Sequence, residues 1–194
     1  MHAAQCVERH ATPLELALPR LCTAKQHLAV AGGRAHVAKE CLTAGVNVGL
    51  GVDGSASNDG SQLLAEVRQA MLLARINEGI HGYSLSNDIN RKLMTAREAL
   101  YLGTRGGAAV LGRGDIGSLE IGKCADFFAI NLNRFEFAGA QLDPVSAAVF
   151  CQPVNVDYTV VGGKFVVKDG HILTVDHQKL IEKHNKAAKR LVQV

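Results

Sequence analysis

Apolar and small residues alternate along the segment 46–52, which reads VNVGLGV. Four apolar side chains are separated by Asn47, Gly49 and Gly51. This pattern predicts a buried strand with one nearly bare face, as in a sheet beneath a covering helix. Asp53 is the first charged residue after the run. Side chains at the carboxyl ends of parallel strands face the ligand crevice, so Asp53 is a candidate site residue. Asp-Gly is also a common turn dipeptide, and the spacing alone leaves a turn-forming role open.

A helical pattern follows the polar loop after Asp53. Asp59 and Gln62 have the spacing of a capping box, which places a helix start near Gly60. Apolar residues then recur at helical spacing and predict an amphipathic helix over 60–76. Its polar residues, among them Glu66, Arg68 and Arg75, are expected mostly on the remaining, solvated surface. Strand, loop and helix form one βα unit of an α/β protein. The segment 77–90 is rich in Gly, Ser and Asn and is predicted to be a loop.

The second half of the chain changes character at about Arg113. Before it, Thr95 and Glu98 form a second capping box and predict a helix that runs to about residue 111. After it, strands predominate. They are predicted at 116–121, 127–132, 158–161, 164–167 and 171–175, with turns at Gly162-Gly163 and Asp169-Gly170. A short helix is predicted over 144–150, and Asp176 is expected to cap a closing helix.

Composition narrows the class of protein. The chain has 194 residues and is 47% hydrophobic, which is ordinary for a globular protein. No apolar run reaches the roughly 18 residues needed to cross a membrane, and the start of the chain has no secretory signal pattern. Five scattered cysteines without a Cys-x-x-Cys pair argue against a disulfide framework and a structural zinc site. We therefore expect a cytoplasmic protein.

The net charge of +3 comes from the last helix, which carries four lysines and Arg190 against Glu182. These charges alternate with apolar residues, and no aromatic residue lies between them. This pattern favours the solvated face of a docked helix over a surface for nucleic acid or acidic lipid. We expect neither nucleic acid nor membrane as a partner.

Glycines at 49, 51 and 54 have the spacing of a dinucleotide-binding fingerprint. In a true fingerprint the glycines turn out of the strand and open a helix whose N-terminus faces the pyrophosphate. Here two of them lie inside the apolar alternation, and Asp53 would place a negative charge where phosphates should bind. A nucleotide-binding module is therefore a distant alternative.

Four segments in order resemble the C-terminal portion of metal-dependent amidohydrolases. The resemblance is to the branch that contains 8-oxoguanine deaminase, cytosine deaminase-like enzymes and triazine hydrolases. The segments are 48–59 (VGLGVDGSASND), 63–73 (LLAEVRQAMLL), 115–126 (DIGSLEIGKCAD) and 157–170. The resemblance implies the α/β fold of the last βα units of a (β/α)8 barrel over 34–113. It further implies a β-sandwich portion over 114–176 and a closing helix over 177–194.

The resemblance also implies a chemistry. In the family, the aspartate that matches Asp53 binds a catalytic zinc or iron ion and passes a proton from water to the leaving nitrogen. A metal lowers the pKa of its water to about 7, which suits hydrolysis of a C–N or C–Cl bond in a small nitrogen heterocycle. The implied activity is deamination of the 8-oxoguanine type. Ser55, Ser57 and Asn58 are candidates for the substrate loop, although loop polarity alone also explains them.

The chain departs from the family in its metal ligands. The family also uses a His-x-His pair and further histidines, and the eight histidines of this chain include no such pair. Residues 1–33 do not follow the family and are assigned to a divergent segment. A complete barrel takes about 250 residues, whereas residues 1–113 are all that precede the β-rich part.

Two further hypotheses follow from these departures. In the first, the chain is part of a deaminase that works with a missing N-terminal half or as a homo-oligomer, and alone it is inactive and retains no metal. In the second, it is a catalytically dead, self-associating fragment.

Overall fold

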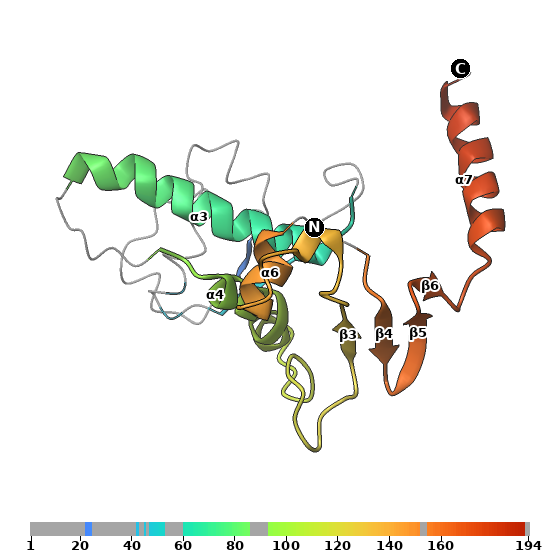
Figure 1. Cartoon of the computed structure of the whole chain (residues 1–194), viewed down its shortest axis with the longest axis horizontal. Helices are drawn as coiled ribbons and strands as arrows, with labels where there is room; N and C mark the ends of the chain where they lie inside the picture. Colours follow the sequence, from blue (N-terminus) through green and yellow to red (C-terminus); the bar gives the residue numbers. More distant parts are fainter. Residues whose placement is uncertain are drawn as a thin grey trace. The chain divides into compact units, whose positions relative to one another are not determined.

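The described part of the chain begins with two short parallel strands, β1 (Cys22–Ala24) and β2 (Val48–Leu50). The computed structural model describes residues 22–24, 42, 45, 47–52, 60–85, 93–151 and 155–192 (Figure 1). The strand predicted over 46–52 is confirmed at its centre, where Val48 is buried. A parallel pair followed by helices confirms the α/β class.

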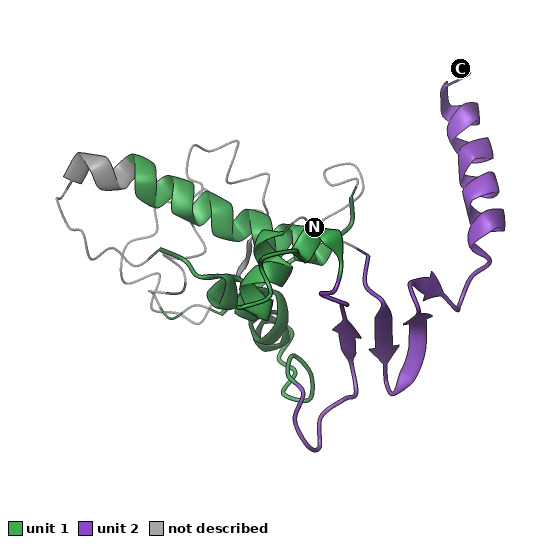
Figure 2. Cartoon of the chain, in the orientation of Figure 1, with its two compact units in different colours: residues 1–118, 134–153 green, residues 119–133, 154–194 purple. Residues whose placement is uncertain are grey.

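The chain divides into two compact units (Figure 2). The first comprises residues 1–118 and 134–153, and the second comprises residues 119–133 and 154–194. Residues 134–153 thus belong to the first unit, although they lie inside the range 114–176. The division into 1–33, 34–113, 114–176 and 177–194 stays a prediction.

Helix α3 (Leu63–Leu85) differs from the helix predicted over 60–76 at both ends: it begins three residues later and ends nine residues later. The prediction of a loop from residue 77 was wrong, because residues 77–85 continue the helix. No proline occurs between residues 61 and 92, and glycine inside a helix costs only about 1 kcal/mol. Asn77 is also buried, so the packed face extends past the last apolar position of the pattern.

Three consecutive segments form one continuous helical stretch after Thr95. They are α4 (Ala96–Tyr101), the π-helical η2 (Leu102–Gly106) and α5 (Gly107–Val110). The predicted capping box is confirmed: Thr95 Oγ1 accepts from the Glu98 N–H at 3.1 Å, and Glu98 Oε2 accepts from the Thr95 N–H at 2.7 Å. The helix length was predicted correctly, but the π turn inside it was not.

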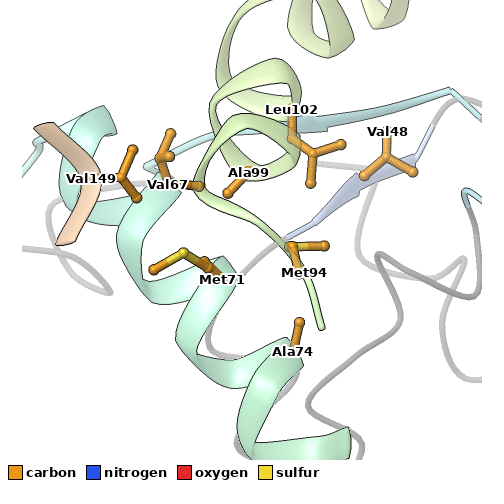
Figure 3. Close-up of a cluster of buried hydrophobic side chains, with 9 residues drawn as sticks. Val48, Val67, Met71, Ala74, Met94, Ala99, Leu102 and Val149 are labelled. Carbon is orange, nitrogen blue, oxygen red and sulfur yellow. The ribbon is translucent and has the colours of Figure 1, made fainter. Parts of the chain in front are cut away.

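The core of the first unit joins β2, α3, α4, η2 and α6 (Pro144–Phe150) (Figure 3). Met71, Ala99, Leu102 and Val149 are fully buried there. The remaining members of the cluster are Val48, Val67, Ala74, Met94 and Ala96. Burial of a single side chain of this size stabilises by about 1.5–3 kcal/mol, so the cluster fixes how these elements pack.

Helix α6 confirms the helix predicted over 144–150. Asp143 caps it by accepting from the N–H groups of Val145 and Ser146, each at 3.2 Å, and Pro144 is in the first helical turn. The short η3 (Phe135–Phe137) precedes it and buries Phe137.

The second unit is a four-stranded antiparallel sheet with a helix. The strands are β3 (Phe127–Ala129), β4 (Tyr158–Val161), β5 (Lys164–Lys168) and β6 (His171–Ile172), in the order β3-β4-β5-β6. Gly162 and Gly163 turn the β4–β5 hairpin with φ of +56° and +77°, which confirms the predicted turn. Asp176 caps α7 (His177–Val192) as predicted, because its carboxylate accepts from the Lys179 N–H at 3.1 Å.

Three predicted strands were wrong in part or whole. Residues 116–121 form bends and a turn in place of a strand. Gly117 and Gly122 adopt φ of +86° and +88°, a left-handed conformation that interrupts an extended run. β3 and β6 end earlier than 132 and 175. None of the helices in the described ranges is both long and apolar enough to cross a membrane.

Candidate functional site

The candidate residues Asp53, Ser55, Ser57 and Asn58 lie in the segment 53–59, which is outside the described residues. Their positions and contacts therefore stay predictions. The structure describes what flanks them: β2 with residues 51 and 52 on one side, and Gly60 with the start of α3 on the other.

Strand β2 and the two residues after it are shielded from most of the solvent. Val48 is buried, and Leu50, Gly51 and Val52 are half-buried. β2 pairs in parallel with β1, and its carboxyl end leads to residue 53. In parallel α/β proteins ligands bind at the carboxyl ends of the strands. The segment 53–59 is attached at that end of β2.

Helix α3 carries two buried polar side chains. Glu66 is 4% exposed and Asn77 is 7% exposed. We expected Glu66 on the solvated surface of the helix, and the structure corrects this. A carboxylate in the first turn is favoured by the positive end of the helix dipole, and Glu66 is in the first turn of α3. The hydrophobic pattern could not reveal it, because a charged residue counts as exposed in such a pattern.

Two arginines of α3 connect it to its neighbours. Arg68 Nε donates to the Phe150 carbonyl at 3.1 Å, and Arg75 Nε donates to the Met94 carbonyl at 2.8 Å. The Arg75 guanidinium also lies 4.8 Å from the centre of the Phe150 ring, a cation–π contact. Both residues were assigned to the surface from sequence. In the structure they join α3 to α6 and to the segment before α4.

The perturbed titratable groups in the described residues serve the fold. Hydrogen bonds from Arg97 and Ser146 hold the pKa of the Asp143 carboxyl well below its usual range. The pKa of Tyr158 is raised by its hydrogen bond to Asp169, at 2.5 Å. Backbone and side-chain hydrogen bonds from Lys179 lower the pKa of Asp176. Each of these groups caps a helix or braces a turn.

The described residues do not fit a catalytic metal by themselves. Within the described ranges, no three His, Cys, Asp or Glu side chains gather closely enough to hold an ion. A catalytic zinc site usually has three protein ligands. The carboxylate expected to bind metal, Asp53, lies outside these ranges.

Comparison with known proteins identifies a family and several relatives. Residues 3–166 match the model of the Amidohydrolase family, so the match begins inside the segment assigned as divergent. The chain is 40% identical over 153 residues to 8-oxoguanine deaminase of Pseudomonas aeruginosa, covering 79% of this chain and 31% of that protein. It is 38% identical over 152 residues to hydroxydechloroatrazine ethylaminohydrolase of a Pseudomonas species, covering 77% and 30%.

Solved structures resemble the same part of the fold. Atrazine chlorohydrolase of Arthrobacter aurescens, complexed with zinc, superposes with a TM-score of 0.74 at 28% identity, over 90% of this chain and 37% of that one. A zinc-bound adenosine deaminase of Xanthomonas campestris gives a TM-score of 0.74 at 24% identity and supports the fold alone. These neighbours are (β/α)8 enzymes that the chain covers in part.

The chain spans about a third of the length of the curated relatives it matches, at 31% and 30%. Its match to the family model nevertheless includes the central strand, the segment with Asp53, and α3. With a family match over most of the chain and a 40% identical relative, the chain belongs to the Amidohydrolase family.

Proposed function

We propose that this chain forms the C-terminal part of a hydrolase that deaminates or dechlorinates a small nitrogen heterocycle, with 8-oxoguanine-type deamination as the reaction. The observation that carries the proposal is the 40% identity to an 8-oxoguanine deaminase. The 38% identity to hydroxydechloroatrazine ethylaminohydrolase favours the same class of ring, in which the attacked carbon lies between nitrogens.

Asp53 is the residue we assign to the chemistry. Hydrolysis of an amidine carbon requires a proton to leave the attacking water and reach the departing nitrogen. A carboxylate at the carboxyl end of β2 is suited to accept that proton and pass it on. A zinc or iron ion, when bound, supplies a lowered pKa for the water, and Asp53 contributes one ligand. Ser55, Ser57 and Asn58 are assigned to the loop that contacts the substrate.

The chain alone is proposed to be inactive and to retain no metal. It spans about a third of its curated relatives, and its described residues gather no three metal ligands. The other ligands then come from a segment that corresponds to the rest of the relatives, or from a second copy of this chain. Neither nucleic acid nor a membrane has a part in this proposal.

The test is complementation. The chain is fused behind the portion of the Pseudomonas aeruginosa 8-oxoguanine deaminase that has no counterpart in it. Release of ammonia or chloride is measured for 8-oxoguanine, cytosine analogues and chlorinated triazines, and bound metal is measured by elemental analysis. We expect activity and about one metal ion per chain in the fusion, and neither in the isolated chain.

Asp53→Ala in the fusion separates the alternatives. Removal of a proton carrier typically costs about 10²–10⁴-fold in rate, so we expect a loss of at least this size. Activity of the isolated chain that survives Asp53→Ala contradicts both the assigned role and the need for a second part. A well-folded fusion without activity favours the catalytically dead fragment. Dinucleotide binding that is lost on Gly54→Ala would favour the nucleotide-binding module.

A further inference from the structure

We propose that the π-helical turn η2 is a positioning device for β2, the strand that leads to Asp53. Gly106 and Gly49 are the positioning residues, because they let helix and strand backbones touch with no side chain between them. The inference deepens the proposed function and rests on it for the role of Asp53.

Strand β2 contacts η2 and the first residue of α5 more closely than any side chain allows. A Cβ on Gly106 would lie 2.2 Å from the Val48 carbonyl oxygen. A Cβ on Gly49 would lie 2.9 Å from the Gly107 Cα and 3.2 Å from its nitrogen. The atoms that would be struck are backbone atoms, which cannot rotate away. The two glycines therefore fix the distance between the strand and the helix.

The π turn is what brings this stretch of the helix against the strand. The Gly107 N–H donates to the Leu102 carbonyl, five residues back, and the Thr104 hydroxyl donates to the Leu100 carbonyl at 2.8 Å. A π turn adds a residue to the helix and is frequently found at functional sites. Leu102 anchors the turn, since its side chain is fully buried.

Both partners of the contact are fixed in the core, so a substitution must displace one of them. Val48 and Leu102 belong to the same buried cluster (Figure 3). Relief of the Gly106 overlap requires a shift of about 1 Å. A misplacement of this size in a catalytic constellation can cost about 10²-fold in rate. Displacement of β2 moves the end of the strand to which Asp53 is attached.

Neighbouring glycines supply matched controls. A Cβ on Gly107 would meet only the Leu102 carbonyl oxygen at 3.9 Å, and a Cβ on Gly51 would meet nothing within 4 Å. A Cβ on Gly103 would lie 2.6 Å from the Val67 Cγ2 of α3 and would not touch β2. Gly103→Ala therefore tests loss of stability without displacement of the strand.

The test uses the complemented enzyme and compares these alanine variants by kcat, KM and thermal unfolding. We expect Gly106→Ala to lower kcat about 100-fold with KM nearly unchanged. Gly49→Ala has a smaller overlap and should lower kcat less. Gly107→Ala and Gly51→Ala should resemble the unsubstituted enzyme. Gly103→Ala should lower the Tm and leave kcat within about twofold.

A second readout needs no activity. In the full 194-residue chain labelled with ¹⁵N, amide chemical shifts report the backbone of β2 directly. Gly106→Ala should move the amide signals of residues 48–53, whereas Gly107→Ala should not. This readout decides the inference even if the fusion is inactive, in which case the proposed function fails separately.

Three results would overturn the inference. One is a folded Gly106→Ala enzyme with the kcat of Gly107→Ala. Another is a Gly103→Ala enzyme that loses as much kcat as Gly106→Ala at an equal loss of Tm. If Gly106→Ala does not fold, Gly49→Ala decides: a kcat and amide spectrum like those of Gly51→Ala would overturn the proposal.

Discussion

Asp143 joins two elements through one carboxylate. It caps α6 and forms a two-bond ion pair with Arg97 of α4, with distances of 2.8 and 2.9 Å. It also accepts from the Ser146 hydroxyl at 2.8 Å. These bonds favour the charged form and lower the pKa of its carboxyl. Asp143 is therefore the residue whose protonation state affects the packing of α6 on α4.

The first prediction concerns the pH dependence of stability. A folded-state pKa below that of the unfolded chain stabilises the fold above the unfolded value, about 3.9, and this stabilisation is lost as pH falls. Asp143→Asn keeps a capping oxygen but removes the charge. We expect a lower Tm than the unsubstituted chain at pH 7 and a gap that narrows below about pH 4. The measurement is thermal unfolding from pH 7 to pH 3.

Asp143→Ala serves as the comparison, because it removes both the cap and the ion pair. It should have the lowest Tm of the three at pH 7. A gap between Asp143→Asn and the unsubstituted chain that stays constant from pH 7 to pH 3 would contradict the assigned role of the charge.

At the scale of the element, α3 contributes Val67, Met71 and Ala74 to the buried cluster of the first unit. Its buried face runs through Val67, Met71, Ala74 and Asn77 at spacings of four, three and three residues. This face contacts α4 and α6. Arg68 adds a polar contact to α6, and Arg75 adds one to the segment before α4. A change on this face should affect stability far more than a change on the opposite face.

The second prediction compares two positions on α3. Met71 is fully buried and Ile76 is 54% exposed. Truncation of a buried side chain leaves a cavity, so Met71→Ala should lower the free energy of unfolding by roughly 2–5 kcal/mol. Ile76→Ala should lower it by about 0.5 kcal/mol or less. Urea denaturation measures the free energy of unfolding of both variants. Equal losses would contradict the burial of Met71 and the exposure of Ile76.

At the scale of the whole molecule, large apolar side chains remain exposed in the second unit. Phe128 and Phe165 of the sheet are 46% and 51% exposed. Helix α7 buries none of its residues, and its apolar residues recur on one face. They are Leu180, Ile181, Ala187, Ala188, Leu191 and Val192. Exposed apolar surface of this kind favours association.

The third prediction is that the isolated chain self-associates through α7. Sedimentation velocity should give species heavier than 20.6 kDa whose proportion rises with concentration. The double variant Leu180→Lys/Leu191→Lys should shift the chain toward the monomer, because each new charge lies on the apolar face. The control variant Gln178→Lys/Asn185→Lys adds the same charge outside that face and should leave association unchanged. Equal effects of the two pairs would indicate general charge repulsion.

Local signals in the sequence determined where most elements begin and turn. The Thr95 capping box, the Asp176 cap and the Gly162-Gly163 hairpin are set by residues within four positions of one another, and each was predicted correctly. Four separated segments together resembled the family, and the match of the family model to residues 3–166 confirms that resemblance. The assignment of Asp53 rests on that resemblance and on its place after β2.

Only the tertiary structure decided how these elements pack. The buried position of Glu66, the continuation of α3 past Ile76 and the π turn against β2 depend on neighbours that are distant in sequence. A hydrophobic pattern treats a charged residue as exposed, and the residues Gly, Ser and Asn over 77–90 were interpreted as a loop. Burial, by contrast, depends on which surfaces meet. Residues 116–121 alternate like a strand, but left-handed glycines and the absence of a partner strand within the described residues leave them as turns.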